Sequence, residues 1–126
     1  MVRPFLLAIA IGVVWTGPGW AQSDEEIAQG RALSEEHCAR CHVVGDFNPM
    51  GGIGSTPSFQ LLVNRLPDWE ERFQTFHVRL PHPSVVRVTG FPYPDPRYNP
   101  PAAEPFEIEL DDIARIMAFA RTLKED

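Results

Sequence analysis

The sequence predicts an all-α fold, and three features lead to that prediction. A capping box that starts at Ser23 opens a helix, and a helical stripe of apolar residues closes the chain. Before that stripe, the 25 residues from Pro81 to Pro105 contain eight prolines. Because proline interrupts helices and is excluded from central strands, we expect a long loop there rather than a sheet.

Four helices are expected. The first follows the sequence S-D-E-E, in which the Ser23 hydroxyl can accept from the Glu26 amide while the Glu26 carboxylate reaches back. The second starts at Pro57, since proline suits a first helical turn, and a Leu-Pro-Asp break separates it from the third. The last has acidic residues in its first turn and basic residues in its last turn, which suits the helix dipole. The expected ranges are 24–39, 57–65, 69–78 and 110–124.

Residues 1–21 have the order of features typical of a secretory signal peptide. One arginine precedes an apolar run of about eleven residues, and a Gly-Pro-Gly break and a small residue follow. The run is shorter than the roughly 20 residues that a membrane-spanning helix needs, although an uncleaved anchor is the alternative. We therefore expect cleavage after Ala21, a single domain over residues 22–126, no stable membrane span, and export to a bacterial periplasm.

The chain is acidic, with a formal net charge of −6. Nucleic acid is therefore not expected as a partner. The acidity suits either general solubility or docking to a basic surface of another protein.

The residues that point to chemistry form one short motif, Cys38-Ala39-Arg40-Cys41-His42, and the chain has no other cysteine. A structural zinc site needs four Cys or His ligands, usually as two pairs. A thioredoxin-like redox pair follows a strand, and none is expected before Cys38. A disulfide between cysteines three apart would close a small strained loop and would leave His42 without a role.

C-x-x-C-H is also the attachment motif of c-type haem, and this interpretation uses all its defining residues. Two thiols one helical turn apart can add to the two vinyl groups of a porphyrin, while the imidazole of the next residue ligates the iron. Attachment takes place after export, which agrees with the predicted leader. We expect one covalent haem c per chain, held by Cys38 and Cys41, with His42 as the proximal iron ligand.

With this motif in place, the chain resembles the small class I, mitochondrial-type cytochromes c of bacteria. Gly30 stands eight residues before Cys38, as a helix glycine does in that family, and R-I-M-A-F-A-R-T-L is similar to the family's C-terminal helix. The resemblance implies that the first and last helices cross where the glycine lets the backbones approach. It also implies three or four helices around one haem; the proline-rich loop over residues 81–105, by contrast, includes a segment longer than relatives need.

The segment G-S-T-P-S-F resembles the family's G-P-S-L/F segment. The resemblance implies that the backbone carbonyl of Pro57 accepts a hydrogen bond from His42, which would fix the ring and raise its basicity. Pro57 thus joins the cofactor-binding residues, and Pro49 is the alternative for that role.

The chain departs from the family on the other side of the iron. Relatives have H-P-x-M-P, whose methionine is the sixth ligand, whereas this chain has H-P-S-V-V. We expect His82 as the distal ligand, with His77 as the second choice; Met50 and an open position remain alternatives. Met117 falls on the apolar stripe of the last helix, where packing is the expected role.

The resemblance implies a periplasmic one-electron carrier with outer-sphere transfer, whose partners are a dehydrogenase or an oxidase, and it implies no enzyme active site. The alternative is a haem protein that binds or senses a small ligand such as NO or CO at an open or histidine-ligated position. Weak peroxidase activity would require an open iron. The segment from Phe91 to Pro105, which includes Tyr93, Arg97 and Tyr98, can cover the haem edge, dock a partner or form a passive loop.

Overall fold

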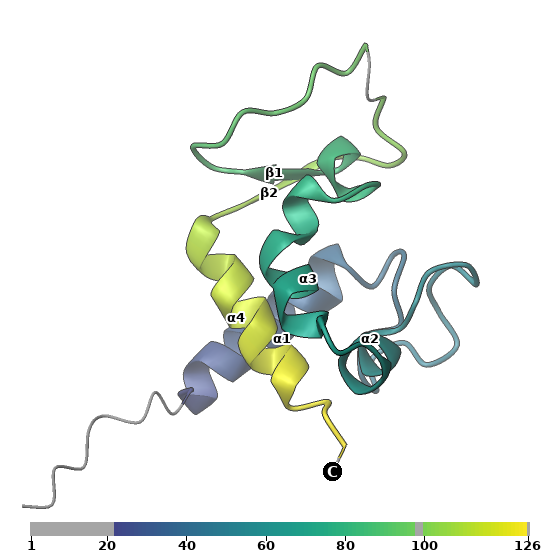
Figure 1. Ribbon diagram of the computed structural model, residues 1–126, viewed down its shortest axis with the longest axis vertical. Coiled ribbons are helices and arrows are strands. Elements are labelled where there is room, and N and C mark those ends of the chain that lie inside the picture. Colours follow the sequence, from purple (N-terminus) through teal and green to yellow (C-terminus); the bar gives the residue numbers. More distant parts are fainter. Residues whose placement is uncertain (1–21, 98–99, 126) are drawn as a thin grey trace, which may run out of the picture.

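The structure is a computed structural model that describes residues 22–97 and 100–125; the predicted leader over residues 1–21 lies outside this part. It is mainly helical, and it adds a short two-stranded sheet that the all-α prediction omits. Figure 1 shows the four α-helices gathered at one end and the strand pair with a long loop at the other. The elements in order are α1 Asp24–His37, α2 Phe59–Arg65, α3 Trp69–Thr75, η1 Phe76–Val78, η2 His82–Ser84, β1 Val86–Val88, β2 Phe106–Ile108 and α4 Leu110–Arg121.

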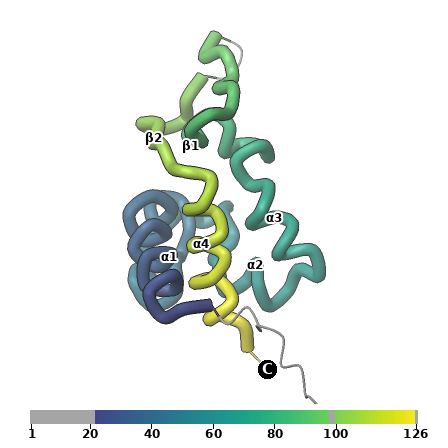
Figure 2. The backbone as a smooth tube through the Cα atoms, turned by 90° about the vertical axis from the view of Figure 1, so that its left-hand side faces the viewer, coloured from purple at the N-terminus to yellow at the C-terminus, as the bar shows by residue number. Residues whose placement is uncertain are grey.

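The crossing of α1 and α4 is the most extensive contact between two elements, and Figure 2 shows α4 lying between α1 and α3. Gly30 and Ser34 are the buried residues of α1, and the Ser34 hydroxyl donates to the Gly30 carbonyl at 2.7 Å. A Cβ atom on Gly30 would lie 1.8 Å from the carbonyl oxygen of Arg115. The close approach of the two backbones at Gly30, which the resemblance implied, is therefore present.

The helix ends differ slightly from the prediction. The capping box of α1 is present, since Glu26 N–H donates to the Ser23 hydroxyl and the Ser23 N–H donates to the Glu26 carboxylate. In α2 the cap is Ser58, whose hydroxyl accepts from the Leu61 N–H at 3.1 Å, so Pro57 precedes the helix. The carbonyl of Pro57 is thus left available to a side chain.

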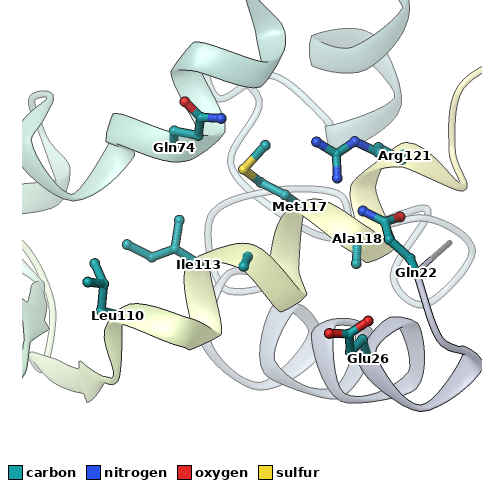
Figure 3. A pocket seen from close by; sticks show the side chains of 9 residues that line it. Gln22, Glu26, Gln74, Leu110, Ile113, Met117, Ala118 and Arg121 are labelled. Atoms are coloured by element: carbon teal, nitrogen blue, oxygen red, sulfur yellow. The ribbon is translucent and has the colours of Figure 1, made fainter. Parts of the chain in front are cut away.

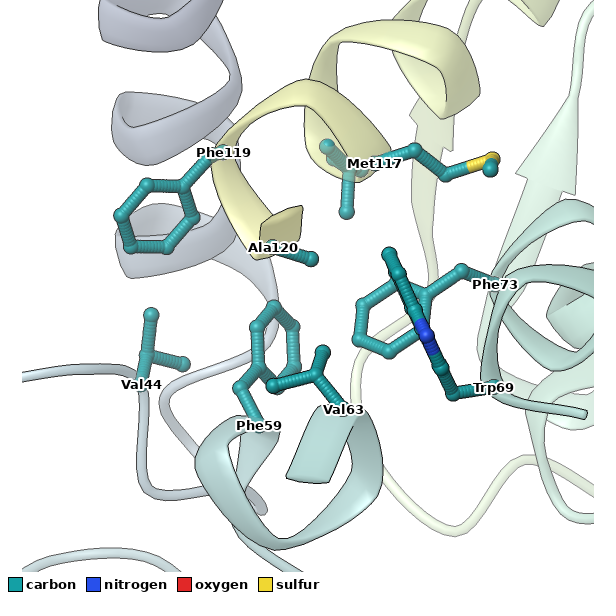
Figure 4. Packing of buried hydrophobic residues seen from close by; sticks show 9 residues of the cluster. Val44, Phe59, Val63, Trp69, Phe73, Met117, Phe119 and Ala120 are labelled. Atoms are coloured by element: carbon teal, nitrogen blue, oxygen red, sulfur yellow. The ribbon is translucent and has the colours of Figure 1, made fainter. Parts of the chain in front are cut away.

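The main core lies between α2, α3 and α4. Figure 4 shows side chains of α2 and α3 converging on α4, with the Phe59 and Phe73 rings packed edge to face at 5.0 Å between centroids. Cys38 and Ala39, at the end of α1, pack against this cluster. Its buried members are Val44, Phe59, Val63, Trp69, Phe73, Ile116, Met117, Phe119 and Ala120.

The sheet corrects the expectation that the chain between the third and last helices is only a loop. β1 and β2 pair in parallel, with Val86 opposite Phe106 and Val88 opposite Ile108. Val86, Val88 and Ile108 are buried together with Ile113 of α4 in a second apolar cluster. Both strands are three residues long and avoid proline, so the proline-rich sequence and the short sheet are compatible.

Candidate functional site

The C-x-x-C-H motif forms a tight turn at the end of α1. The Cys38 N–H still donates to the Ser34 carbonyl at 2.9 Å, as in a helix. The N–H groups of Cys41 and His42 then both donate to the Cys38 carbonyl, at 3.0 and 2.9 Å. The two cysteines are therefore held one turn apart, and they are not joined by a disulfide.

The environment of the motif does not suit a dithiol redox site or a zinc site. Burial, with a smaller contribution from Cys41, raises the pKa of the Cys38 thiol to about 12. Redox-active C-x-x-C pairs have the opposite property, a lowered thiol pKa. Within the described residues, no three His, Cys, Asp or Glu side chains form a group that could hold a metal ion.

His42 is fixed by the bond that the resemblance implied. Its Nδ1 lies 2.7 Å from the Pro57 carbonyl oxygen, and its ring meets Phe59 edge to face at 5.6 Å between centroids. Burial lowers the pKa of His42 and outweighs the opposite effect of the Pro57 carbonyl, so the ring is neutral at pH 7. Because a carbonyl only accepts, Nδ1 carries the proton and Nε2 keeps a lone pair for a metal.

Asn48 stabilises the same turn, a role that the sequence analysis did not predict. Its side-chain NH2 donates to the carbonyls of Ala39 and His42, each at 2.9 Å, and its Oδ1 accepts from the Val44 N–H at 2.7 Å. Its Asn-Pro dipeptide predicts only a turn, because such dipeptides are common in turns. The three bonds show that this asparagine closes the loop onto the backbone of His42.

His82 lies opposite His42, although 39 intervening residues separate them in the chain. Its Nδ1 lies 3.1 Å from the Arg79 carbonyl oxygen, and Phe76 meets its ring edge to face at 5.4 Å. Burial lowers the pKa of His82, with a further decrease caused by His42. His82 is thus neutral as well, and the Arg79 carbonyl leaves its Nε2 as the free acceptor.

The two imidazole rings lie close together and nearly parallel. Their ring centroids are 6.1 Å apart and their planes differ by 5°. Two imidazoles that bind one metal from opposite sides, each through a bond of about 2.0 Å, have centroids roughly 6 Å apart. The separation and the nearly parallel planes are therefore compatible with one metal ion between His42 and His82, and the cysteine pair precedes His42 in the chain.

The other candidate ligands lie elsewhere. His77 contacts Phe76 and Phe91, at 6.0 and 5.7 Å between centroids, and its buried Nδ1 has no partner among the described residues. Met50 is 97% exposed, whereas Met117 is 4% exposed and belongs to the main core, as expected. Of the candidate distal ligands, His82 is thus the one that the structure places beside the ring of His42.

Two exposed apolar side chains lie on segments close to the histidines. On the His42 side, the Ile53 N–H donates to the Cys41 carbonyl, and the Ile53 side chain is 50% exposed. On the other side, Leu80 stands two residues before His82 and is 80% exposed. Exposed apolar surface near polar groups with free lone pairs is typical of a site for an apolar ligand.

Two cavities lie away from the motif. The larger, about 900 Å³, is lined by residues from the start of α1, from α3 and from α4, as Figure 3 shows, and it includes neither cysteine. The smaller, about 230 Å³, lies between His77, β1 and the proline-rich loop, with Phe91 and Tyr93 in its wall. Neither contains His42 or His82, so the chemistry suggested by the histidine pair does not depend on them.

No helix in the described part of the chain is long and apolar enough to cross a membrane. Comparison with protein-family models, with curated proteins and with solved structures found no match to this chain. A functional assignment therefore depends on the motif and on the geometry of the two histidines.

Proposed function

We propose that this chain is an exported monohaem c-type cytochrome, similar to the class I family, that carries one electron between partner proteins. Cys38 and Cys41 would hold the haem: each S–H would add across a vinyl double bond, the sulfur to one carbon and the hydrogen to the other, so no oxidant would be needed. The raised pKa of Cys38 keeps this thiol protonated and so protects it from oxidation before attachment.

The observation that carries the proposal is the pair of facing imidazoles beside the cysteine turn. His42 and His82 are each tied through Nδ1 to a backbone carbonyl, at 2.7 and 3.1 Å, and each keeps Nε2 unprotonated. A lone imidazole in this arrangement can be a core residue. Two parallel ones at 6.1 Å, one directly after C-x-x-C, support a haem iron that would be held between two histidines.

The residues of the site suit electron transfer rather than substrate chemistry. The bound haem would supply one redox-active iron, and neutral histidines on both sides favour a lower potential than a histidine–methionine pair does. Carbonyl-fixed rings hold the same positions in both oxidation states, which keeps the reorganisation on electron transfer small. Apolar neighbours such as Ile53 and Leu80 would cover the haem and exclude water while leaving an edge for a partner.

The expected location and partners follow from the same proposal. Haem c is attached after export, so a leader over residues 1–21 and a periplasmic location belong together. A periplasmic dehydrogenase or oxidase would donate or accept the electron.

The test is covalent haem staining together with optical and EPR spectra of the purified protein. The wild-type chain should give a haem-staining band on a denaturing gel, and the double variant Cys38→Ala/Cys41→Ala should give none. Thr122→Val, which removes one hydrogen bond at the end of α4, is a control that should keep the band. A wild-type chain without covalent haem would refute the proposal.

The spectra separate the carrier from the alternative function. Low-spin iron in both oxidation states is expected for two histidine ligands. High-spin iron that binds CO as fast as an open haem does would instead favour the small-ligand-binding function.

A further inference from the structure

The proline-rich segment after β1 contacts the turn that carries His82. The Tyr93 hydroxyl donates to the Ser84 carbonyl at 2.8 Å, and Ser84 is the last residue of η2. We propose that Tyr93 is a positioning residue, which holds η2 so that His82 stays on the iron. This inference rests on the proposed function and adds to it the residue that controls the sixth ligand.

The turn that carries His82 has little support of its own. It is a single 3₁₀ turn, closed by the Val85 N–H donating to the His82 carbonyl at 2.8 Å. The Ser84 hydroxyl donates to the Pro81 carbonyl at 2.7 Å, and Ser84 is buried. Such short helices have poorer hydrogen-bond geometry than α-helices, so a contact from outside η2 matters more for its position.

Tyr93 is itself fixed to the sheet. The guanidinium of Arg87 lies 4.3 Å above the centre of the Tyr93 ring. Arg87 is the middle residue of β1 and pairs with Glu107 of β2, which leads directly into α4. A continuous set of contacts therefore runs from the sheet through Arg87 and Tyr93 to the His82 turn.

The composition of the segment agrees with this role. Pro92 and Pro94 flank Tyr93, and each fixes its own φ near −65°. A stiff segment loses less conformational entropy when it is held in one place, so its single hydroxyl contact is more effective than it would be on a flexible loop. The positioning role thus falls to a residue of the segment that was expected to cover the haem edge, to dock a partner or to form a passive loop.

The test measures how often His82 leaves the iron, using CO as the probe. In the reduced holoprotein, CO binds only when the sixth position opens, so its binding rate follows the open fraction. Tyr93→Phe removes one neutral hydrogen bond and should raise that rate roughly fivefold, with covalent haem unchanged. Arg87→Met keeps the aliphatic stem but removes the cation–π contact, and a rise of about two- to fivefold is expected.

The decisive control repeats Tyr93→Phe in a His82→Ala background. If Tyr93 acts through His82, the substitution has no effect once His82 is absent. An equal increase in both backgrounds, or none in the wild-type background, would overturn the inference while leaving the covalent haem and the proposed function intact. Thr122→Val, which also removes one hydroxyl-to-carbonyl bond, should leave the CO rate unchanged. If Tyr93→Phe does not accumulate as holoprotein, Arg87→Met in the same two backgrounds decides the question.

Discussion

The two histidines face each other, but the chain holds them in different ways. His42 closes the tight turn that follows α1, and Asn48 and the Pro57 carbonyl fix its backbone and ring. His82 sits in a one-turn helix, and the Tyr93 hydroxyl donates to the last residue of that helix from the proline-rich segment. The Nδ1-to-carbonyl distance reflects the contrast, being 2.7 Å for His42 and 3.1 Å for His82.

The contrast suggests a division of roles. The His42 side is built from contacts within about 15 residues and belongs to the main core, so it forms together with the helices. The His82 side depends on a sheet and a loop that close over long sequence distances. We infer that the first side determines whether haem is attached, and that the second tunes what the iron does afterwards.

The largest expected effect comes from disrupting the crossing of α1 and α4, which supports the His42 side of the site. Gly30→Ala places a methyl group 1.8 Å from the Arg115 carbonyl oxygen, and backbone cannot move aside as a side chain does. The helices must separate, and we expect a loss of about 3 kcal/mol or more despite the better helix propensity of alanine. Urea unfolding followed by the fluorescence of Trp69 measures the loss.

Gly54→Ala is the matched control for that substitution. A Cβ atom on Gly54 has no atom within 4 Å, and its backbone does not need a positive φ. A change of no more than about 0.5 kcal/mol is expected. Equal effects at Gly30 and Gly54 would contradict the close helix crossing.

A smaller loss of unfolding free energy is expected for Asn48→Ala. Comparison with Asn64→Ala should distinguish a role at the cysteine turn from a general contribution to stability. Asn48→Ala removes three hydrogen bonds at the cysteine turn and should cost about 2–3 kcal/mol. Asn64→Ala also removes three, to Gln60, Leu123 and Glu125, and should cost a similar amount. The two variants should therefore unfold at similar urea concentrations.

Their difference should appear at the site. Asn48→Ala should lower the yield of covalent haem and broaden the EPR spectrum, because the His42 carbonyl loses its hydrogen bond from the Asn48 side chain. Asn64→Ala should leave both unchanged. If the two variants gave the same haem yield, Asn48 would be an ordinary structural residue.

The sequence predicted the elements whose signals are local. The first helix was expected over residues 24–39 and spans Asp24–His37, and the capping box formed as expected. The parallel strand pair was missed because each strand has three residues, and alternation over three residues is too short to recognise. What pairs Val86 with Phe106 is burial against Ile113 of α4, which no local pattern contains.

The candidate site, too, was predictable from the sequence only in part. The motif could be recognised directly in the sequence, whereas the Pro57 contact was expected only from the resemblance to the family. His82 was chosen from its place in the sequence, and its alignment with His42 at 6.1 Å depends on the path of residues 66–81. Asn48 and Tyr93 gave signals only for loops, because their roles arise from what the folded chain brings beside them.

The smallest expected effect is a pH dependence of the folding stability that arises from His77, on the His82 side of the site. Burial lowers the pKa of His77, which lies in η1 between Phe76 and Phe91. The unfolded chain, with an ordinary histidine pKa of about 6.5, then binds more protons than the folded chain does. Stability is therefore complete above that value and decreases as the pH falls through the folded pKa. His77→Phe keeps an aromatic ring there and removes the titration, so its urea midpoint should fall less than that of the wild type between pH 7.5 and 5.5. Identical slopes would show that His77 is solvated well enough to titrate normally, and the acid sensitivity would then have to come from elsewhere in the chain.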